Sequence, residues 1–291
     1  MPQFPESSAR MCEAFSGKAE RVGEGEQQFL LFQSGTPSDE TVSALVSCYR
    51  TVFGNGFPVE KHPWNEYLVC SHCKGQESIQ KVYGIEDVQF VSDLEKNGIP
   101  SLECCGSPLE PVFSPDILRE NIRKQFEEAG FFGIAVLNSD AFDNERNPFT
   151  GFMWGNWTTP EKAWENYIGH LFERCHSPVG FKEYADGLRV QGVSSDQVVF
   201  HIPEQGILPS KKRGRQYMEM MWYYFLHLQK YFPEEFAANV GIAPFQEGNA
   251  ASKHVKLFGW KAGVVCPESG LVVKTGALDE IIRVWREKFG L

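Results

Sequence analysis

The sequence predicts a mixed α/β (α+β) fold in which a central mixed sheet is flanked by helices. Short apolar runs typical of strands alternate along the chain with amphipathic helical segments, and residues that favour turns separate them. The chain has 291 residues, of which 42% are apolar and 13% aromatic. This is enough for one large domain, or for one domain with a substantial insertion.

Each element is expected from its hydrophobic pattern and from the signals at its ends. Residues 1–28 are rich in Glu, Ser and Gly and are expected to form a flexible leader. Strands are expected at 29–33, 131–138, 151–155, 198–202, 237–242, 264–266 and 271–274. Helices are expected at 41–53, 115–129, 159–175, 216–230, 249–258 and 278–289. The segments 180–192 and 203–210 are expected to be a loop and a turn.

End signals justify the helices in chain order. The 41–53 helix follows a candidate N-cap residue, either Ser38 or Asp39, and Pro115 opens the next helix, which Gly130 ends. Thr159 and Pro160 start the helix after the central hairpin. The 216–230 segment is apolar on nearly every side, which is typical of a helix buried on several faces.

A cysteine-containing segment interrupts this pattern. Residues 29–56 and 115–291 are expected to form the main domain, and 57–114 an inserted subdomain. The spacing of Cys70 and Cys73 is that of a zinc knuckle, and the adjacent Cys104 and Cys105 complete a four-cysteine set. The sequence therefore predicts a closed, structural zinc-ribbon-like site, with His72 or His62 as reserve ligands. The alternative is that these residues are buried thiols without a metal.

Charge limits the classes of partner. The formal net charge is −10 and the isoelectric point is near 5.3, which argues against nucleic acid and against anionic membranes. No apolar run reaches the roughly 18 residues that span a bilayer. Residues 1–28 also lack the apolar core of a signal peptide, so a cytoplasmic location is expected.

A basic cluster at 211–215 stands out in this acidic chain. It contains four cationic side chains and Gly214, and it lies between an apolar strand and the 216–230 helix. Main-chain N–H groups and the positive end of the helix dipole both point at such a position, so it can hold a phosphate. The candidate ligands are Lys212, Arg213, Gly214, Arg215 and Gln216. The alternative is a solvated turn.

The order of these elements and two motifs resemble the GNAT superfamily of N-acetyltransferases, over roughly residues 29–53 and 116–275. Arg213 and Gly214 fit the phosphate loop of that family, although Gln216 and Met218 stand at its later small positions. A later motif of that family is matched by Asn249, Ala251, Phe258, Gly259 and Trp260. The resemblance implies a GNAT-like central mixed sheet.

The same resemblance implies an acyl-CoA-dependent N-acyltransferase that transfers an acetyl group from acetyl-CoA to a primary amine. Residues 212–216 would hold the pyrophosphate, Leu208 and Asn249 would also contact the cofactor, and the pantetheine would lie along residues 198–208. Glu204 is the expected general base, and His201 is the runner-up. The family's frequent general acid, a tyrosine, falls on Val255 here.

Two functions remain open on the sequence alone. The first is catalysis on an amine-bearing small molecule or peptide, and the acidic surface favours a cationic acceptor. The second is a non-catalytic module that keeps the fold, holds CoA and uses the zinc subdomain to bind a protein partner.

Overall fold

The computed structural model describes residues 20–23, 27–53, 67–70, 76–78, 103–105, 107–111, 115–138, 148–174, 177–208, 213–246, 257–265 and 270–289. Its main feature is an eight-stranded sheet in the order β1-β2-β7-β8-β9-β10-β12-β11. The strands in that order are β1 (Glu20–Val22), β2 (Phe29–Gln33), β7 (Phe132–Leu137), β8 (Phe149–Thr158), β9 (Val199–Ile207), β10 (Val240–Gln246), β12 (Leu271–Ala277) and β11 (Lys261–Val265). Neighbours are antiparallel except β9 and β10, which are parallel.

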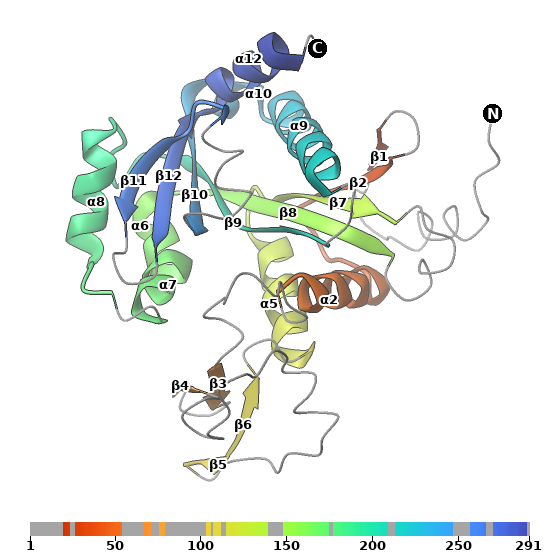
Figure 1. The fold of residues 1–291 in the computed structure, drawn as a ribbon, viewed down its shortest axis with the longest axis vertical. Helices are drawn as coiled ribbons and strands as arrows, with labels where there is room; N and C mark the ends of the chain where they lie inside the picture. The colour runs from red at the N-terminus through yellow and green to blue at the C-terminus, as the bar shows by residue number, and fades with distance from the viewer. Residues whose placement is uncertain are drawn as a thin grey trace, which may run out of the picture.

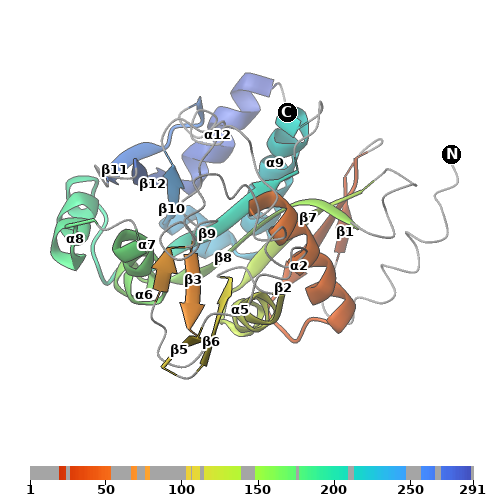
Figure 2. The same ribbon diagram turned by 60° about the horizontal axis from the view of Figure 1, so that its bottom comes forward.

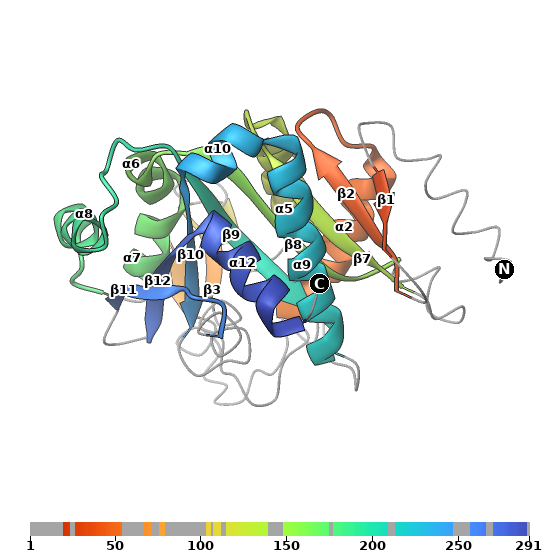
Figure 3. The same ribbon diagram turned by 90° about the horizontal axis from the view of Figure 1, so that it is seen from above.

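Helices cover both faces of this sheet (Figure 1). One face carries α9 (Arg213–Tyr231), α10 (Pro233–Ala238) and α12 (Leu278–Phe289), and Figure 3 shows α9 and α12 crossing above the strands. The other face carries α2 (Asp39–Phe53) and α5 (Pro115–Glu127) over β2, β7 and β8. On that second face, α6 (Pro160–Ala163), the π-helical turn η2 (Trp164–Ile168), α7 (Gly169–Arg174) and α8 (Phe181–Val190) pack near β9, β10 and β12.

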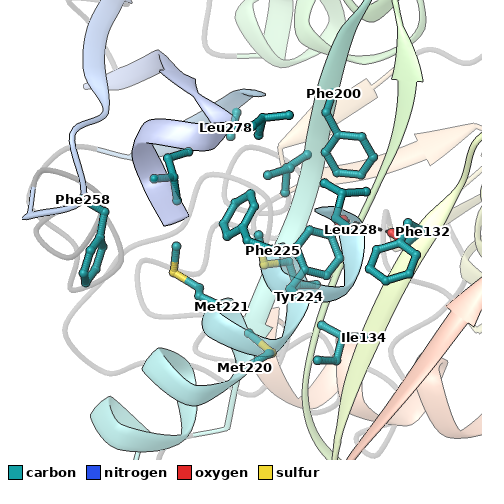
Figure 4. Close-up of a cluster of buried hydrophobic side chains, with 14 of the residues drawn as sticks. Phe132, Ile134, Phe200, Met220, Met221, Tyr224, Phe225, Leu228, Phe258 and Leu278 are labelled. Atoms are coloured by element: carbon teal, nitrogen blue, oxygen red, sulfur yellow. Dashed lines mark hydrogen bonds between the residues drawn. The ribbon is translucent and has the colours of Figure 1, made fainter. Parts of the chain in front are cut away.

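The helix α9 anchors the largest core cluster (Figure 4). Its buried stripe of Tyr217, Met220, Met221, Tyr224, Phe225 and Leu228 lies against the sheet. The Tyr224 hydroxyl donates to the main-chain oxygen of Phe132 at 2.9 Å, so this buried polar group is satisfied. The start of α9 is therefore held by a rigid body of packed side chains.

Most expected elements are present in the structure. The mixed sheet flanked by helices is confirmed, as are the strands β2 and β7 and the helices α2, α5 and α12 near their expected bounds. The β7–β8 hairpin is antiparallel as expected, but β8 is longer than the expected 151–155 and spans Phe149–Thr158. The 249–256 part of the expected late helix lies outside the described residues.

The expected turn at 203–210 is wrong over its first part. The segment 203–207 continues β9 in register with β8. Pro203 is accommodated because the register shifts beside it, and Gly206 is needed because α2 approaches closely. A Cβ on Gly206 would lie 2.4 Å from Val52 Cγ1.

Other boundaries also differ from the sequence expectation. The expected loop 180–192 contains α8, whose start is stabilised by a bond from the Gly180 N–H to Glu183 Oε2 at 3.1 Å. The expected strand 237–242 begins only at Val240, because Pro233 opens the short helix α10 before it. The expected leader 1–28 contributes β1, which pairs with β2. The helix α9 begins at Arg213, within the basic cluster, and not at Gln216.

Parts of the expected insertion 57–114 form a second sheet in the order β4-β3-β6-β5 (Figure 2). Its strands are β3 (Tyr67–Cys70), β4 (Gln76–Ser78), β5 (Glu103–Cys104) and β6 (Ser107–Pro111), all antiparallel. Much of 57–114 lies outside the described residues, so the expected domain boundary stays a prediction.

A separate observation concerns membranes. Among the residues that the structure describes, no helix is both long enough and apolar enough to cross a bilayer.

The close approach of α2 to β9 gives a test of the fold. We expect Gly206→Ala to lower the free energy of unfolding by about 1–3 kcal/mol, because the added methyl group overlaps Val52 and must displace it. Urea unfolding of the purified protein measures this change. The matched control is Gly214→Ala in the first turn of α9, where an added Cβ meets nothing within 4 Å. It is expected to raise stability by about 0.5–1 kcal/mol. An unchanged urea midpoint for Gly206→Ala would contradict the close approach.

Candidate active site

The two parallel strands at the centre of the sheet pair only briefly. Their ladder joins Gly241 to Phe200 and Ile242 to His201, and the strands then continue to Gln246 and Ile207 respectively. Counted on from the last pair, Pro203 would face Pro244, and neither residue has an N–H group to donate. The sequence thus removes donors at the point where the two strands diverge, so main-chain groups of β9 beyond this point lie outside the described β9–β10 ladder.

A bulge in β9 lies at the same point. Against β8, Glu204 pairs with Trp154 and His201 pairs with Asn156, so β9 uses three steps where β8 uses two. A Cβ on Gly155 would lie 2.3 Å from the His201 carbonyl oxygen, which explains why glycine is required opposite the bulge. Bulges re-aim side chains and are common beside active sites.

The bulge places the Glu204 side chain on the face of the sheet that carries α2 and α5 and also the helices α6 to α8. Its neighbour Gln205 accepts from the Tyr217 hydroxyl of α9 on the opposite face, at 2.7 Å. Gly206, on the same face as Glu204, contacts α2. Glu204 itself is half-buried and its Oε1 accepts from the Tyr167 hydroxyl at 3.4 Å. A half-buried carboxylate here can accept a proton from a bound ligand.

His201 occupies a different environment. Its side chain is only 3% exposed, and burial lowers its pKa to about 3. Its Nε2 atom has no hydrogen-bond partner among the described residues. The ring is therefore neutral near pH 7, and it packs edge-on against the Tyr167 ring with 5.7 Å between centroids. This geometry favours Glu204 over His201 as a proton acceptor.

The first turn of α9 contains most of the expected phosphate ligands. Main-chain N–H groups in a first helical turn have no partner within the helix, and they carry the positive end of the dipole. The Arg215 side chain is 83% exposed, and its Nε donates to Glu219 at 2.7 Å along the helix surface. Gln216 donates to Gln27 Oε1 at 2.8 Å. Gly214 is exposed and leaves open space above the turn.

Of the remaining expected cofactor ligands, the structure describes Leu208 and Arg213. The Leu208 N–H donates to the Thr150 carbonyl at 2.7 Å, so it extends the β8–β9 pairing and is already used. Arg213 is the first residue of α9. Lys212 and Asn249 lie outside the described residues.

Two of the four expected metal ligands, Cys70 and Cys104, lie in strands of the small sheet, and Cys105 is a turn residue after β5. Cys70 pairs with Leu109 and Cys104 pairs with Ser107, so both cysteines lie beside positions of β6 that are two residues apart. Cys105 is exposed, forms no disulfide and has a left-handed main-chain conformation, with φ of 47°. Cys73 lies outside the described residues. Among the described residues there is no group of three His, Cys, Asp or Glu side chains that could hold a metal.

Tyr167 was not among the residues expected at the site, because the 159–175 segment was expected to be a regular helix. The available signal was Gly169, a residue unfavourable inside a helix. A second polar pair is formed by Asn156 and Glu128, in which the Asn156 amide donates to Glu128 Oε2, and no role in the candidate site is assigned to it. Desolvation raises the pKa of Glu128, which is a half-buried carboxylate.

Comparison with protein-family models and with curated proteins gives no match. Among solved structures, the chain is similar to one described as a putative acetyltransferase, with 11% identity, a TM-score of 0.39, and coverage of 99% of this chain and 100% of that chain. It is also similar to an aminoglycoside 6'-acetyltransferase type Ii, with 7% identity, a TM-score of 0.33, and coverage of 56% and 78%. A third is Arabidopsis thaliana NAA60 in complex with a bisubstrate analogue, with 12% identity, a TM-score of 0.31, and coverage of 64% and 91%. Because the identities and TM-scores are this low, the function proposed below rests on the geometry described above.

Proposed function

We propose that the chain is an acyl-CoA-dependent N-acyltransferase of the GNAT type, which transfers an acetyl group from acetyl-CoA to a primary amine. The observation that carries this proposal is the parallel β9–β10 pair, which diverges directly after His201 and Ile242. Main-chain donors and acceptors of β9 beyond that pair can bond the amides of an extended pantetheine arm. The helix α9 then starts six residues after β9 ends at Ile207, which brings its positive end to the same edge of the sheet.

The pyrophosphate of the donor is assigned to the first turn of α9. The turn supplies main-chain N–H groups from 213–216, and Arg213 and Arg215 add positive charge in a chain whose formal net charge is −10. Arg215 is largely exposed in its ion pair with Glu219, so solvent weakens the pair and the guanidinium can exchange it for a phosphate contact. Lys212 and Asn249 are proposed as further ligands, and Leu208 as an apolar contact of the donor.

Glu204 is assigned as the general base. The acceptor amine arrives protonated, and transfer of one proton to the Glu204 carboxylate leaves the nitrogen lone pair that attacks the thioester carbonyl. The thioester supplies the activated acyl group, and main-chain N–H groups stabilise the charge that develops on its oxygen. The C–N bond forms as the C–S bond breaks, and the leaving sulfur receives a proton. The net reaction releases amide, free CoA and one proton.

A structural zinc ion is proposed for the small sheet. Cys70 is the last residue of β3 and Cys104 the last residue of β5, and in the sequence Cys73 and Cys105 follow them by three residues and one residue respectively. Cys70 and Cys104 flank β6 from its two sides, beside Leu109 and Ser107, so the proposal of one four-cysteine site rests on the cysteine spacing in the sequence. Such a closed site would stabilise the insertion and take no part in acyl transfer.

The pyrophosphate assignment predicts a loss of donor affinity. We expect Arg215→Ala to weaken acetyl-CoA binding by about five- to tenfold, because a charge-assisted hydrogen bond to phosphate is lost. Calorimetric titration with acetyl-CoA, repeated with dephospho-CoA, measures the dissociation constant. The matched control is Arg189→Ala, since Arg189 is 78% exposed and paired on its own helix with Asp186 at 2.8 Å. Equal affinities for wild type and Arg215→Ala would remove Arg215 from the site.

The assignment of the base predicts a loss of turnover. We expect Glu204→Gln to lower kcat by about 100-fold or more while the dissociation constant of acetyl-CoA stays within about twofold. The assay follows CoA release with a thiol reagent, using spermidine, kanamycin and a lysine-rich peptide as acceptors. Glu128→Gln is the control carboxylate and is expected to keep wild-type kcat. A Glu204→Gln variant as fast as wild type would overturn the assignment.

The zinc proposal predicts one zinc ion per chain. Metal analysis of protein purified under reducing conditions should find about one equivalent of zinc, and Cys104→Ser should remove most of it because a ligand of a closed site is lost. The control is Cys48→Ala: Cys48 is fully buried in α2 and forms no disulfide, so zinc content should stay the same. Substoichiometric zinc in the wild type would contradict the proposal.

A further inference from the structure

Tyr167 reaches the centre of the sheet from the helices inserted between β8 and β9. Its hydroxyl donates to Glu204 Oε1 at 3.4 Å, across 37 residues of sequence. Its ring packs edge-on against His201, with 5.7 Å between ring centroids. Both Tyr167 and Glu204 are half-buried, so the pair is reachable by a ligand and is partly shielded from water.

A local irregularity of the helix orients this tyrosine. Tyr167 lies in η2, where the Gly169 N–H returns to the Trp164 carbonyl five residues earlier, and not four as in an α-helix. The extra residue turns the side chains before and after it relative to a regular helix. A Cβ on Gly169 would lie 2.9 Å from the Trp164 carbonyl oxygen and 3.0 Å from its Nε1, so glycine makes the turn possible. Such π-turns are rare and occur frequently at functional sites.

His201 completes the arrangement as a packing surface. It is buried, and burial lowers its pKa to about 3, so it presents an uncharged ring to Tyr167 at neutral pH. The ring contact limits the rotation of the Tyr167 side chain, and the main chain of η2 sets its direction. The phenol is therefore held with its oxygen beside the Glu204 carboxylate.

We propose that Tyr167 is a positioning residue for acyl transfer: its hydroxyl holds the Glu204 carboxylate in the orientation that receives the proton of the acceptor amine. This inference rests on the proposed function and adds to it a residue from the inserted helices. A carboxylate on a strand rotates about three side-chain bonds, and each misdirected rotamer removes the base from reach. A hydrogen bond to one oxygen orients the other oxygen towards the ligand. Tyr167 acts through Glu204 and need not touch the substrate.

A double-mutant cycle tests this dependence. We expect Tyr167→Phe, which keeps the ring against His201, to lower kcat by about tenfold, in line with the loss of one hydrogen bond to a charged group. The dissociation constant of acetyl-CoA should not change. In the Glu204→Gln background the same substitution should change kcat by less than about twofold, since the carboxylate it orients is gone.

The control is Tyr184→Phe. Tyr184 is fully buried in the same group of helices, contacts Trp164 with 4.9 Å between ring centroids, and its hydroxyl has no hydrogen-bond partner among the described residues. It should keep wild-type kcat. Urea unfolding of every variant shows whether each is folded, and a Tyr167→Phe variant with a wild-type midpoint is expected.

The outcomes separate this inference from the proposed function. A wild-type kcat for Tyr167→Phe, or an equal tenfold loss in both the wild-type and the Glu204→Gln backgrounds, overturns the positioning role and leaves the acyltransferase in place. If wild-type protein neither binds acetyl-CoA nor releases CoA with spermidine, kanamycin or the lysine-rich peptide, the proposed function is overturned and this inference with it.

Discussion

The short ladder between β9 and β10 is the constraint on which the candidate site depends. A parallel pair within an otherwise antiparallel sheet would normally continue along both strands, since unpaired main-chain groups are costly. Here the pairing ends after Ile242 and His201, and Pro203 and Pro244 come next but one on each strand. Proline cannot donate, so continued pairing would gain little there. The main-chain groups released by this divergence are what a ligand with its own amides can bond.

The bulge in β9 and the long helix α9 place the other groups of the candidate site close to the point where β9 and β10 diverge. Because β9 gains one residue between Glu204 and His201, both side chains face the same side of the sheet, which a regular strand would forbid at that spacing. One becomes a half-buried carboxylate and the other a buried neutral ring. On the opposite face, the packed stripe of α9 and the bond from Tyr217 to Gln205 connect the helix start to the same strand. The strand β9 thus carries the candidate base and also contacts the helix whose first turn is the candidate phosphate site.

How much of this could be predicted from the sequence depends on the distance over which each signal acts. Local signals predicted α2, α5, α12 and β7 well, since Asp39, Pro115 and Gly130 act within one turn of the chain. Glu204 was identified because the family resemblance implies a carboxylate on the central strand, but that strand was expected to end at Ile202, because the pairing with β8 that extends it is long-range. For Tyr167 the local sequence offered no signal beyond Gly169. Its place in the site follows from its hydrogen bond to Glu204, which lies 37 residues further along the chain. The metal and donor ligands at Cys73, Lys212 and Asn249 remain predictions.

The distribution of charge along the chain bears on which acceptor the proposed reaction would use. The chain is acidic overall, with a formal net charge of −10, whereas the first turn of α9 contains Arg213 and Arg215. In the proposed reaction an anionic donor would be attracted to this turn, whereas a cationic acceptor would be attracted by the negative field of the rest of the chain. Glu204 stands opposite Trp154 on β8 and beside the Tyr167 ring, and aromatic faces attract ammonium groups as a carboxylate does. The two substrates of the proposed amine acylation differ in the sign of their charge, so the basic first turn of α9 would favour the anionic donor and the net negative charge of the chain would favour the cationic acceptor.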